Sequence, residues 1–227
     1  MNEHMIETTR EKNISVLSQL FKQYGIDEKS LGWTKNKQKL RFEQMLSGFN
    51  LNDTSILDVG CGFGDLYEHL KTTRPDTDFD YTGIDIMKEF IDIDKNKFPG
   101  IPFYTSDLFS FNPGRKYRFV INCGCLTFLD PKNENESYEY IDAFIGKNIE
   151  LCEDDGVSII HFLTDKVDYR TSTEDFHISP ERILSIAYSH SRRVILDNSV
   201  FPFEACLFIY IDDSFRKENT TFIRAGI

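Results

Sequence analysis

The fold of this chain is decided by the stretch Ile56-Leu57-Asp58-Val59-Gly60-Cys61-Gly62-Phe63-Gly64. Its first four residues have the mostly apolar character of a short buried strand, and glycines then alternate with other residues up to the start of a helical segment at Asp65. Glycine lets the backbone turn sharply and lets a ligand approach where a side chain would collide. The stretch therefore predicts a strand, a tight ligand-facing turn and a helix, in that order.

The charge around this turn indicates which kind of ligand it faces. The dinucleotide fingerprint is G-x-G-x-x-G, but here the third glycine comes one residue early and Asp65 stands where the fingerprint would end. Asp58 and Asp65, with no Lys or Arg beside them, would repel a pyrophosphate and would attract a ligand that carries an ammonium and a sulfonium. We therefore expect a ligand that is cationic near this turn.

Short apolar runs and helical stretches alternate along the rest of the chain. We expect strands near 55–60, 79–85, 101–105, 117–123, 156–163, 192–197 and 205–211, and helices near 64–72, 87–97, 138–151 and 180–189. Such alternation is typical of an α/β fold, a doubly wound and mostly parallel sheet covered on both faces. The connection from Asp197 to Glu204 is too short for a helical crossover, so the last strand should be antiparallel.

Three further strand ends bring polar groups to the same edge of the predicted sheet. Asp85 lies 21 residues beyond Gly64 (85 − 64 = 21), close to the roughly 20-residue spacing expected of a carboxylate that accepts ribose hydroxyls. The next two strand ends are Ser106-Asp107-Leu108 and Asn122-Cys123-Gly124. Asp107 has an alternative interpretation as a helix cap or an exposed loop acid.

These strand ends resemble the motifs of class I, Rossmann-like, S-adenosylmethionine-dependent methyltransferases over about Ser55 to Ile211, and the C-terminal part resembles a bacterial branch of that family. The resemblance implies a seven-stranded sheet ordered 3-2-1-4-5-7-6 with strand 7 antiparallel. It implies that S-adenosyl-L-methionine is the cofactor, with its methionyl part at the glycine turn, its ribose at Asp85 and its adenine at Asp107 and Leu108. The expected cofactor-binding residues are Asp58, Gly60, Cys61, Gly62, Gly64, Asp85, Ile86, Asp107, Leu108, Asn122 and Cys123.

Two ionisable residues are candidates for the chemical step. His161, near the end of the fifth strand, titrates in a range that suits proton removal near neutral pH, although a hydrogen-bonded core histidine is an equal alternative. Glu204 begins the last strand, where it is either a carboxylate facing the substrate or an exposed strand-end acid. A loop after the fifth strand supplies Tyr169 and Arg170 as candidate substrate contacts, with a solvated loop as the alternative.

The N-terminal part gathers basic residues around the only tryptophan of the chain. Two helices are expected there, one ending near Tyr24 and one at about 35–46, whose basic start opposes the helix dipole. We expect Trp33, Lys37 and Arg41 to bind substrate or to close over the cofactor carboxylate. The alternative is a solvated basic face with Trp33 and Phe42 packed inward.

Length and composition favour one domain with small additions. The 227 residues divide into an N-terminal helical extension or lid (1–50), a methyltransferase domain (51–213) and a C-terminal tail (214–227). The formal charge of −11 disfavours nucleic acid, five scattered cysteines indicate reduced thiols and no metal site, and no apolar stretch is long enough for a membrane. We expect a cytoplasmic enzyme.

The expected acceptor of the methyl group is a small molecule. One alternative is methylation of a protein or an RNA, and another is a partner protein that binds S-adenosylmethionine without chemistry. The sequence leaves the oligomeric state open.

Overall fold

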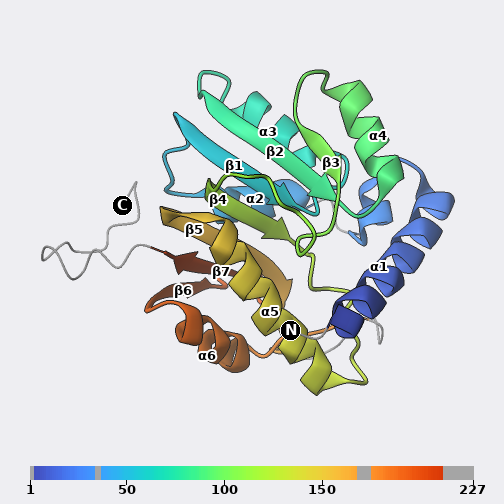
Figure 1. The fold of residues 1–227 in the computed structure, drawn as a ribbon, viewed down its shortest axis with the longest axis vertical. Helices are drawn as coiled ribbons and strands as arrows, with labels where there is room; N and C mark the ends of the chain where they lie inside the picture. The colour runs from blue at the N-terminus through green and yellow to red at the C-terminus, as the bar shows by residue number, and fades with distance from the viewer. Residues whose placement is uncertain (1–2, 34–36, 168–174, 212–227) are drawn as a thin grey trace, which may run out of the picture.

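The computed structural model describes residues 3–33, 37–167 and 175–211. They form a three-layered α/β structure in which helices cover both faces of one sheet (Figure 1). The helical elements are α1 (Glu3–Tyr24), the 3₁₀ turn η1 (Glu28–Leu31), α2 (Gln38–Leu46), α3 (Asp65–Thr73), α4 (Lys88–Lys97), α5 (Glu134–Leu151) and α6 (Pro180–His190). The strands are β1 (Thr54–Val59), β2 (Phe79–Asp85), β3 (Phe103–Thr105), β4 (Tyr117–Cys123), β5 (Cys152–Leu163), β6 (Arg193–Asp197) and β7 (Glu204–Tyr210).

The sheet has the predicted topology. Its seven strands follow the order β3-β2-β1-β4-β5-β7-β6, and β7 pairs antiparallel with both of its neighbours. The other pairs are parallel, because α3, α4 and α5, and the loop between β3 and β4, carry the chain back to the edge where the parallel strands begin. The prediction of a doubly wound, mostly parallel sheet with an antiparallel last strand and N-terminal helices is confirmed.

Several predicted boundaries were wrong. The second helix begins at Gln38 and not near 35, and Lys37 stands at its N-terminus without a side-chain cap. Strand β5 begins at Cys152, four residues before the predicted start, because its first residues still pair with β4 beyond a register shift. Helix α5 begins at Glu134, where the Asn133 side chain accepts a hydrogen bond from the Glu136 N–H.

The 3₁₀ turn η1 was missed, although its end signals are visible in the sequence. The Asp27 side chain accepts a hydrogen bond from the Lys29 N–H, and Gly32 ends the turn in the left-handed region at φ 82°. Only four residues lie between these signals, too few for a helical period to show.

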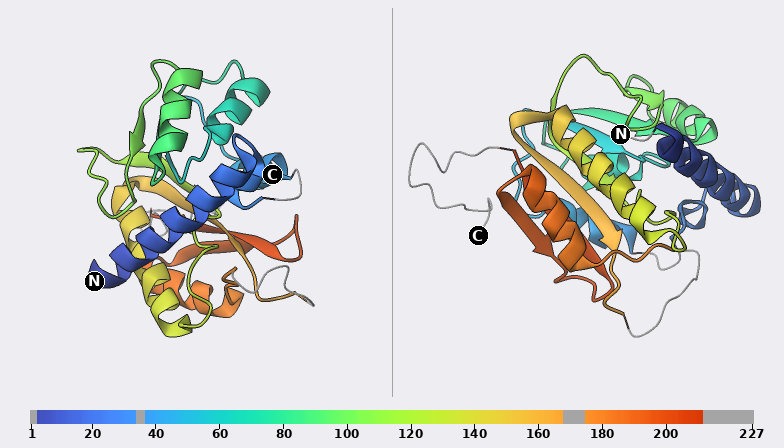
Figure 2. Two further views of the ribbon diagram at one scale, coloured as in Figure 1. Left: turned by 90° about the vertical axis from the view of Figure 1, so that its right-hand side faces the viewer. Right: turned by 60° about the horizontal axis from the view of Figure 1, so that its bottom comes forward.

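Successive side chains of each strand point to opposite faces of the sheet, so the core has one part on each face. Ile56 packs with residues of α2, α3 and α4, whereas its neighbour Leu57 packs with residues of α5 and α6. Helix α1 lies apart from both layers and crosses the edge where the parallel strands end (Figure 2). This placement of α1 closes the space above the strand ends.

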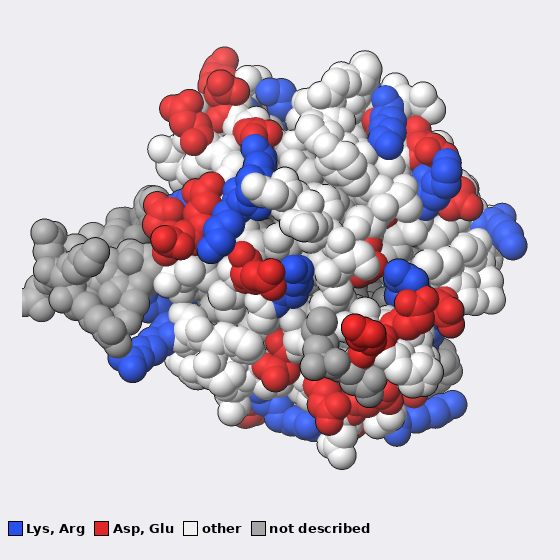
Figure 3. Space-filling view, viewed as in Figure 1, with Lys and Arg blue, Asp and Glu red and all other residues white. Residues whose placement is uncertain are grey.

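Charge on the face that carries α5 and α6 is mixed. Described acidic and basic side chains lie interspersed there and do not gather into one basic surface (Figure 3). Among the residues that the structure describes, no helix is long and apolar enough to cross a membrane.

Two glycines with the same backbone angle test how tightly the turn after β1 is packed. Gly64 and Gly114 both have φ 67°, but an added Cβ would lie 2.7 Å from the Phe98 ring at Gly64 and would meet nothing within 4 Å at Gly114. We expect Gly114→Ala to lower the free energy of unfolding by about 1–2 kcal/mol, the cost of a left-handed alanine. Gly64→Ala should cost about 1–3 kcal/mol more through overpacking.

Urea unfolding monitored by circular dichroism measures both variants. Equal losses of stability would contradict the packing that the structure gives to the turn.

Candidate active site

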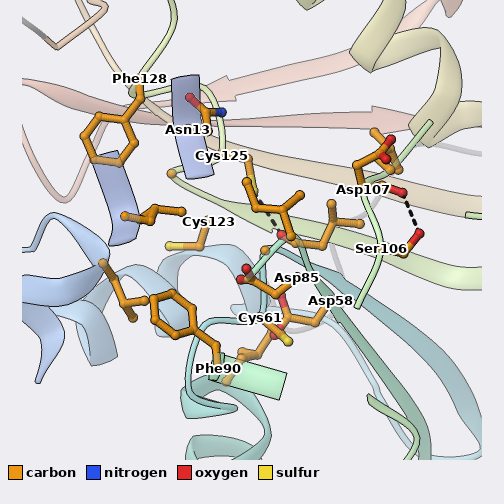
Figure 4. Close-up of a pocket in the computed structure, with 18 of the residues that line it drawn as sticks. Asn13, Asp58, Cys61, Asp85, Phe90, Ser106, Asp107, Cys123, Cys125 and Phe128 are labelled. Carbon is orange, nitrogen blue, oxygen red and sulfur yellow. Dashed lines mark hydrogen bonds between the residues drawn. The ribbon is translucent and has the colours of Figure 1, made fainter. Parts of the chain in front are cut away.

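A cavity lies at the carboxyl edge of the sheet, between the turn after β1 and the N-terminal helices (Figure 4). Its floor comes from the ends of β1, β2 and β4 and from the loop after β3, and its roof comes from α1 and the segment around η1. The lining residues include Asn13, Leu17, Leu31, Trp33, Phe42, Asp58, Gly60, Cys61, Asp85, Ile86, Phe90, Asp107, Leu108, Cys123, Gly124 and Phe128. The strand ends that the sequence singled out therefore surround one cavity.

The glycine turn has the sharp conformation that its sequence predicts. Gly60, Gly62 and Gly64 all have positive φ values, 72°, 59° and 67°. The N–H groups of Gly60 and Cys61 both donate to the Ile84 carbonyl oxygen at the end of β2, at 2.8 and 3.0 Å. A Cβ on Gly60 would lie 2.5 Å from the Cys125 sulfur. The turn is thus a cradle whose shape requires bare backbone.

Asp85 ties the end of β2 to this turn. Its Oδ2 accepts a hydrogen bond from the Gly62 N–H at 3.0 Å, and its Oδ1 accepts one from the Met87 N–H at 2.8 Å. Burial raises the pKa of the carboxyl to about 6, against the lowering effect of these backbone hydrogen bonds. Asp85 lines the cavity and retains oxygen lone pairs for a ligand, so its expected role at a ribose stays a prediction.

Two further buried carboxyl groups stand close to the turn. Asp58 accepts a hydrogen bond from the Tyr81 hydroxyl at 2.6 Å, and burial raises its pKa to about 7. Asp94 accepts a hydrogen bond from the Cys61 thiol, with sulfur and oxygen 3.7 Å apart, and burial raises its pKa to about 8. A nearby cation would stabilise the ionised form of all of these carboxyls, as expected from the acidic sequence around the turn.

The sequence did not single out Tyr81 or Asp94. The aromatic Tyr81 belongs to a strand and Asp94 to a helix, so only the packing of β2 and α4 against the turn reveals their contacts.

Asp107 caps a turn, as its alternative interpretation proposed, and it also lines the cavity. Its Oδ1 caps the following turn by accepting hydrogen bonds from the N–H groups of Phe109 and Ser110, at 2.9 and 3.0 Å. Its Oδ2 lies 3.3 Å from the Arg10 guanidinium of α1, and the residue lines the cavity beside Leu108. The carboxylate therefore links the roof to the floor, and its contact with adenine stays a prediction.

Asn122 and Cys123 diverge because alternate residues of a strand point to opposite faces. The Asn122 side chain donates a hydrogen bond to the Asn148 side chain of α5 at 2.8 Å and does not line the cavity. The Cys123 side chain lines the cavity, and burial raises the pKa of its thiol to about 12, so the thiol is protonated at neutral pH. In the described part of the chain, no group of acidic, histidine and cysteine residues forms a metal site.

Four candidate residues from distant parts of the sequence meet beside this cavity. Arg41 of α2 forms a bidentate ion pair with Glu204 of β7, with its Nε 2.7 Å from Oε2 and its Nη2 2.6 Å from Oε1. His161 of β5 places its Nε2 2.9 Å from the same Oε2. The Trp33 ring lies 4.1 Å from the Arg41 guanidinium carbon and meets the His161 ring edge-on at 5.9 Å between centroids.

Burial sets the ionisation of this cluster. Burial alone would raise the pKa of the Glu204 carboxyl, but hydrogen bonds from His161 and Arg41 outweigh it and bring the pKa to about 2. Burial lowers the pKa of His161, against the raising effect of Glu204. At neutral pH the cluster therefore holds an ionised Glu204, a guanidinium and a neutral imidazole.

The interpretation of Glu204 as an exposed strand-end acid was wrong, since the residue is only 1% exposed. The alternative interpretation of the basic residues as a solvated face was right only in part. Lys37 is exposed, whereas Arg41 is buried with Trp33 and Phe42. Lys37 lies outside the cavity and places its Nζ 5.6 Å from the centre of the Phe201 ring. Tyr169 and Arg170 lie outside the described residues.

Sequence reasoning also missed the residues that α1 and the loop after β4 contribute. Asn13 directs its side chain from α1 into the cavity, and its Oδ1 is buried without a hydrogen-bond partner in the described structure (Figure 4). The Phe128 ring forms part of the wall and packs against Gly32. No local pattern marks these residues, because they become neighbours of the glycine turn only when α1 folds across it.

A seven-stranded sheet of this order, with a glycine cradle after β1 and an acid at the end of β2, defines the class I, Rossmann-like methyltransferase fold. Residues 56–145 match a family model described as a methyltransferase domain. Residues 56–145 therefore form a methyltransferase domain, and the bare cradle beside buried carboxyls fits S-adenosylmethionine, which is a cationic cofactor. A comparison with curated protein sequences finds no match.

Solved structures support the fold. The chain is similar to magnesium protoporphyrin IX methyltransferase (ChlM) from Synechocystis PCC 6803 with bound SAH, with 16% identity, 89% of this chain and 97% of that chain covered, and a TM-score of 0.63. It is similar to DhpI in its SAH complex, with 16% identity, coverage of 92% and 97%, and a TM-score of 0.60. It is also similar to the N-methyltransferase NodS from Bradyrhizobium japonicum WM9 in complex with SAH, with 16% identity, coverage of 87% and 96%, and a TM-score of 0.60.

Replacing Asp85 tests its role in cofactor binding. We expect Asp85→Ala to weaken S-adenosylmethionine binding by about 1.5–3 kcal/mol, the scale of hydrogen bonds lost to a charged group. Isothermal titration calorimetry measures the change. Asp92→Ala, on the exposed side of α4, is the matched control and should bind as the wild type does. Wild-type affinity in Asp85→Ala would remove this residue from the cofactor site.

The raised carboxyl pKa values predict how binding depends on pH. Asp58 and Asp85 have pKa values of about 7 and about 6 in the fold against an ordinary value of 3.8, so these two carboxyls hold more protons in the folded protein than in the unfolded chain in this window. The contribution of these two carboxyls to stability without cofactor should therefore fall as the pH rises from about 4 to 7. A cationic cofactor favours the ionised carboxyls, so its affinity should rise over about pH 5.5–7, with release of protons on binding.

Calorimetry at pH 6.5 in two buffers of different ionisation enthalpy counts the released protons, and urea unfolding at several pH values gives the stability. Proton uptake on binding would contradict the assignment, and so would an Asp58→Asn variant whose stability depends on pH as that of the wild type does.

Proposed function

We propose that the chain transfers the methyl group of S-adenosylmethionine to a small molecule that binds in the part of the cavity lined by Leu31, Trp33, Phe42 and Phe128. The observation that carries this proposal is the roof formed by α1. Arg10 of α1 reaches Asp107 at 3.3 Å, and Lys12 donates a hydrogen bond to the Leu129 carbonyl oxygen at 3.1 Å. These contacts hold α1 against the loops after β3 and β4, so a folded protein or an RNA strand would meet α1 before it met the glycine turn.

The lining of this part of the cavity favours an acceptor with a flat apolar body. Aromatic side chains from the segment after η1, from α2 and from the loop after β4 line it beside the apolar Leu31. Small-molecule sites are typically concave and apolar with a few polar groups that set orientation. Polar side chains beside this region include Gln38 of α2, which lines the cavity, and Arg41, which precedes Phe42 in the chain and is paired with Glu204.

Each part of the site has its own expected role in methyl transfer. The bound cofactor supplies a methyl group that is already activated on a sulfonium. The glycine turn and Asp85 would hold the cofactor, and α1 would exclude water from the space above the strand ends. His161 would remove a proton where the acceptor carries one, with Glu204 stabilising the imidazolium that forms.

Transfer of labelled methyl tests this proposal against its alternatives. The protein is incubated with tritiated S-adenosylmethionine and with the metabolite, protein or RNA fraction of a bacterial extract. We expect label in the metabolite fraction alone. Asp85→Ala, which should bind the cofactor poorly, is the control for background transfer.

Label in the protein or RNA fraction would mean that the acceptor is that macromolecule and not a small molecule. Tight cofactor binding by calorimetry without transfer to any fraction would favour a binding protein without chemistry.

A further inference from the structure

The cluster beside the cavity leaves two buried polar atoms without partners. Arg41 Nη1 and His161 Nδ1 are buried and have no hydrogen-bond partner among the described residues, although both side chains are otherwise fixed by Glu204. The two residues are 3% and 0% exposed. A buried polar atom without a partner is costly and is rare in folded proteins, so two of them in one cluster indicate a place for a ligand group.

The chemistry of the contact fixes which nitrogen of His161 carries the proton. Glu204 is ionised, so its Oε2 can only accept a hydrogen bond, and the hydrogen in the contact of 2.9 Å must belong to His161 Nε2. A neutral imidazole has only one N–H group. Nδ1 therefore presents a free lone pair, which is the form required of a general base.

Arg41 acts on His161 through Glu204. Its two hydrogen bonds, at 2.7 and 2.6 Å, keep the carboxylate ionised and fix its orientation. Without the guanidinium, the buried carboxyl would tend to take up a proton, and a protonated carboxyl could donate to His161 and reverse its tautomer. Arg41 is thus a positioning residue for the base.

The cluster is next to the cavity. His161 is the direct register partner of Cys123, whose side chain lines the cavity, and the Gly124 N–H donates to the His161 carbonyl oxygen at 3.2 Å. The Trp33 ring lines the cavity and also lies 4.1 Å from the Arg41 guanidinium carbon and 5.9 Å from the centre of the His161 ring, so it links the cavity to the cluster.

We propose that the acceptor atom is the oxygen of an acidic hydroxyl on a planar molecule, bound beside Trp33 between His161 Nδ1 and the Arg41 guanidinium. This inference rests on the proposed small-molecule function and adds the class of the acceptor. A hydroxyl can donate to Nδ1, and its oxygen accepts hydrogen bonds and becomes negative as its proton leaves. An amine that arrives as an ammonium would be repelled by the guanidinium and could accept no hydrogen bond from Nη1.

The chemical step balances with the groups present. The acceptor O–H proton moves to His161 Nδ1, while the oxygen forms a bond to the methyl carbon. The bond between that carbon and sulfur breaks, and its electron pair stays on sulfur as a neutral thioether. The imidazolium is stabilised by Glu204 and later loses its proton to water.

The first test reads the tautomer of His161 directly and needs no substrate. Long-range proton–nitrogen correlation spectra of ¹⁵N-labelled protein at pH 7.5, assigned with His161→Gln, should show a neutral ring with its proton on Nε2. In Arg41→Met, and more weakly in Arg41→Lys, the populations of the two tautomers should change. Arg10→Met, which removes a guanidinium paired with Asp107, is the matched control and should leave His161 unchanged.

A wild-type ring protonated on Nδ1 or on both nitrogens overturns the assignment of the base. An unchanged tautomer in both folded Arg41 variants removes the positioning role of Arg41.

The second test identifies the methylated atom. A metabolite extract is treated with S-adenosylmethionine that carries a CD₃ group, and the position of CD₃ in the product is determined by mass spectrometry. CD₃ on a hydroxyl oxygen supports the proposal, and CD₃ on nitrogen or carbon overturns it while leaving the small-molecule function intact. With no labelled metabolite, the proposed function itself fails.

His161→Ala should then lower kcat by about 100-fold or more on that product, the range for loss of a general base, with cofactor affinity unchanged. Unchanged turnover overturns the role of Nδ1.

Discussion

A charge that leaves water must find a partner inside the protein, and this constraint organises the carboxyl edge of the sheet. The ion pair of Arg41 with Glu204 satisfies it by joining a helix near the N-terminus to the last strand, at positions 163 apart in the sequence. Removing one partner of such a buried pair typically costs about 3–5 kcal/mol, because the other charge is left alone. The pair therefore fixes how α2 sits on the sheet, and His161 takes its orientation from the same carboxylate.

The same constraint applies to the buried carboxyl groups around the glycine turn. Asp58, Asp85 and Asp94 are buried without a basic partner among the described contacts, and burial raises the pKa of each of them, to about 7, 6 and 8. Backbone N–H groups and the Tyr81 hydroxyl satisfy part of their hydrogen-bonding capacity. A cationic cofactor supplies the missing charge, so binding and ionisation of the floor are coupled. The acidic floor and the paired cluster thus give one cavity two electrostatic environments.

Much of the fold followed from local patterns. Alternating apolar runs and helical stretches predicted the parallel sheet, and the short connection from Asp197 to Glu204 predicted its antiparallel last strand, which β7 confirms. The boundaries were less predictable. The extra residues at the start of β5 pair through a register shift with β4, and η1 depends on end signals only four residues apart. Such details depend on neighbours in space that no sequence window contains.

By itself the sequence determined the part of the site that faces the methyl donor. The turn from Gly60 to Gly64 is recognised by the backbone conformation that glycine allows, and Asp85 by its spacing along the chain. It also named Trp33, Arg41, His161 and Glu204, each as a separate candidate with a structural alternative. Only the tertiary structure decided that these four form one buried cluster and that Asn122 turns away to Asn148. The physical reason is that burial and pairing of charge depend on which elements pack together, and residues 43 or 163 positions apart leave no sign of their contact in local composition.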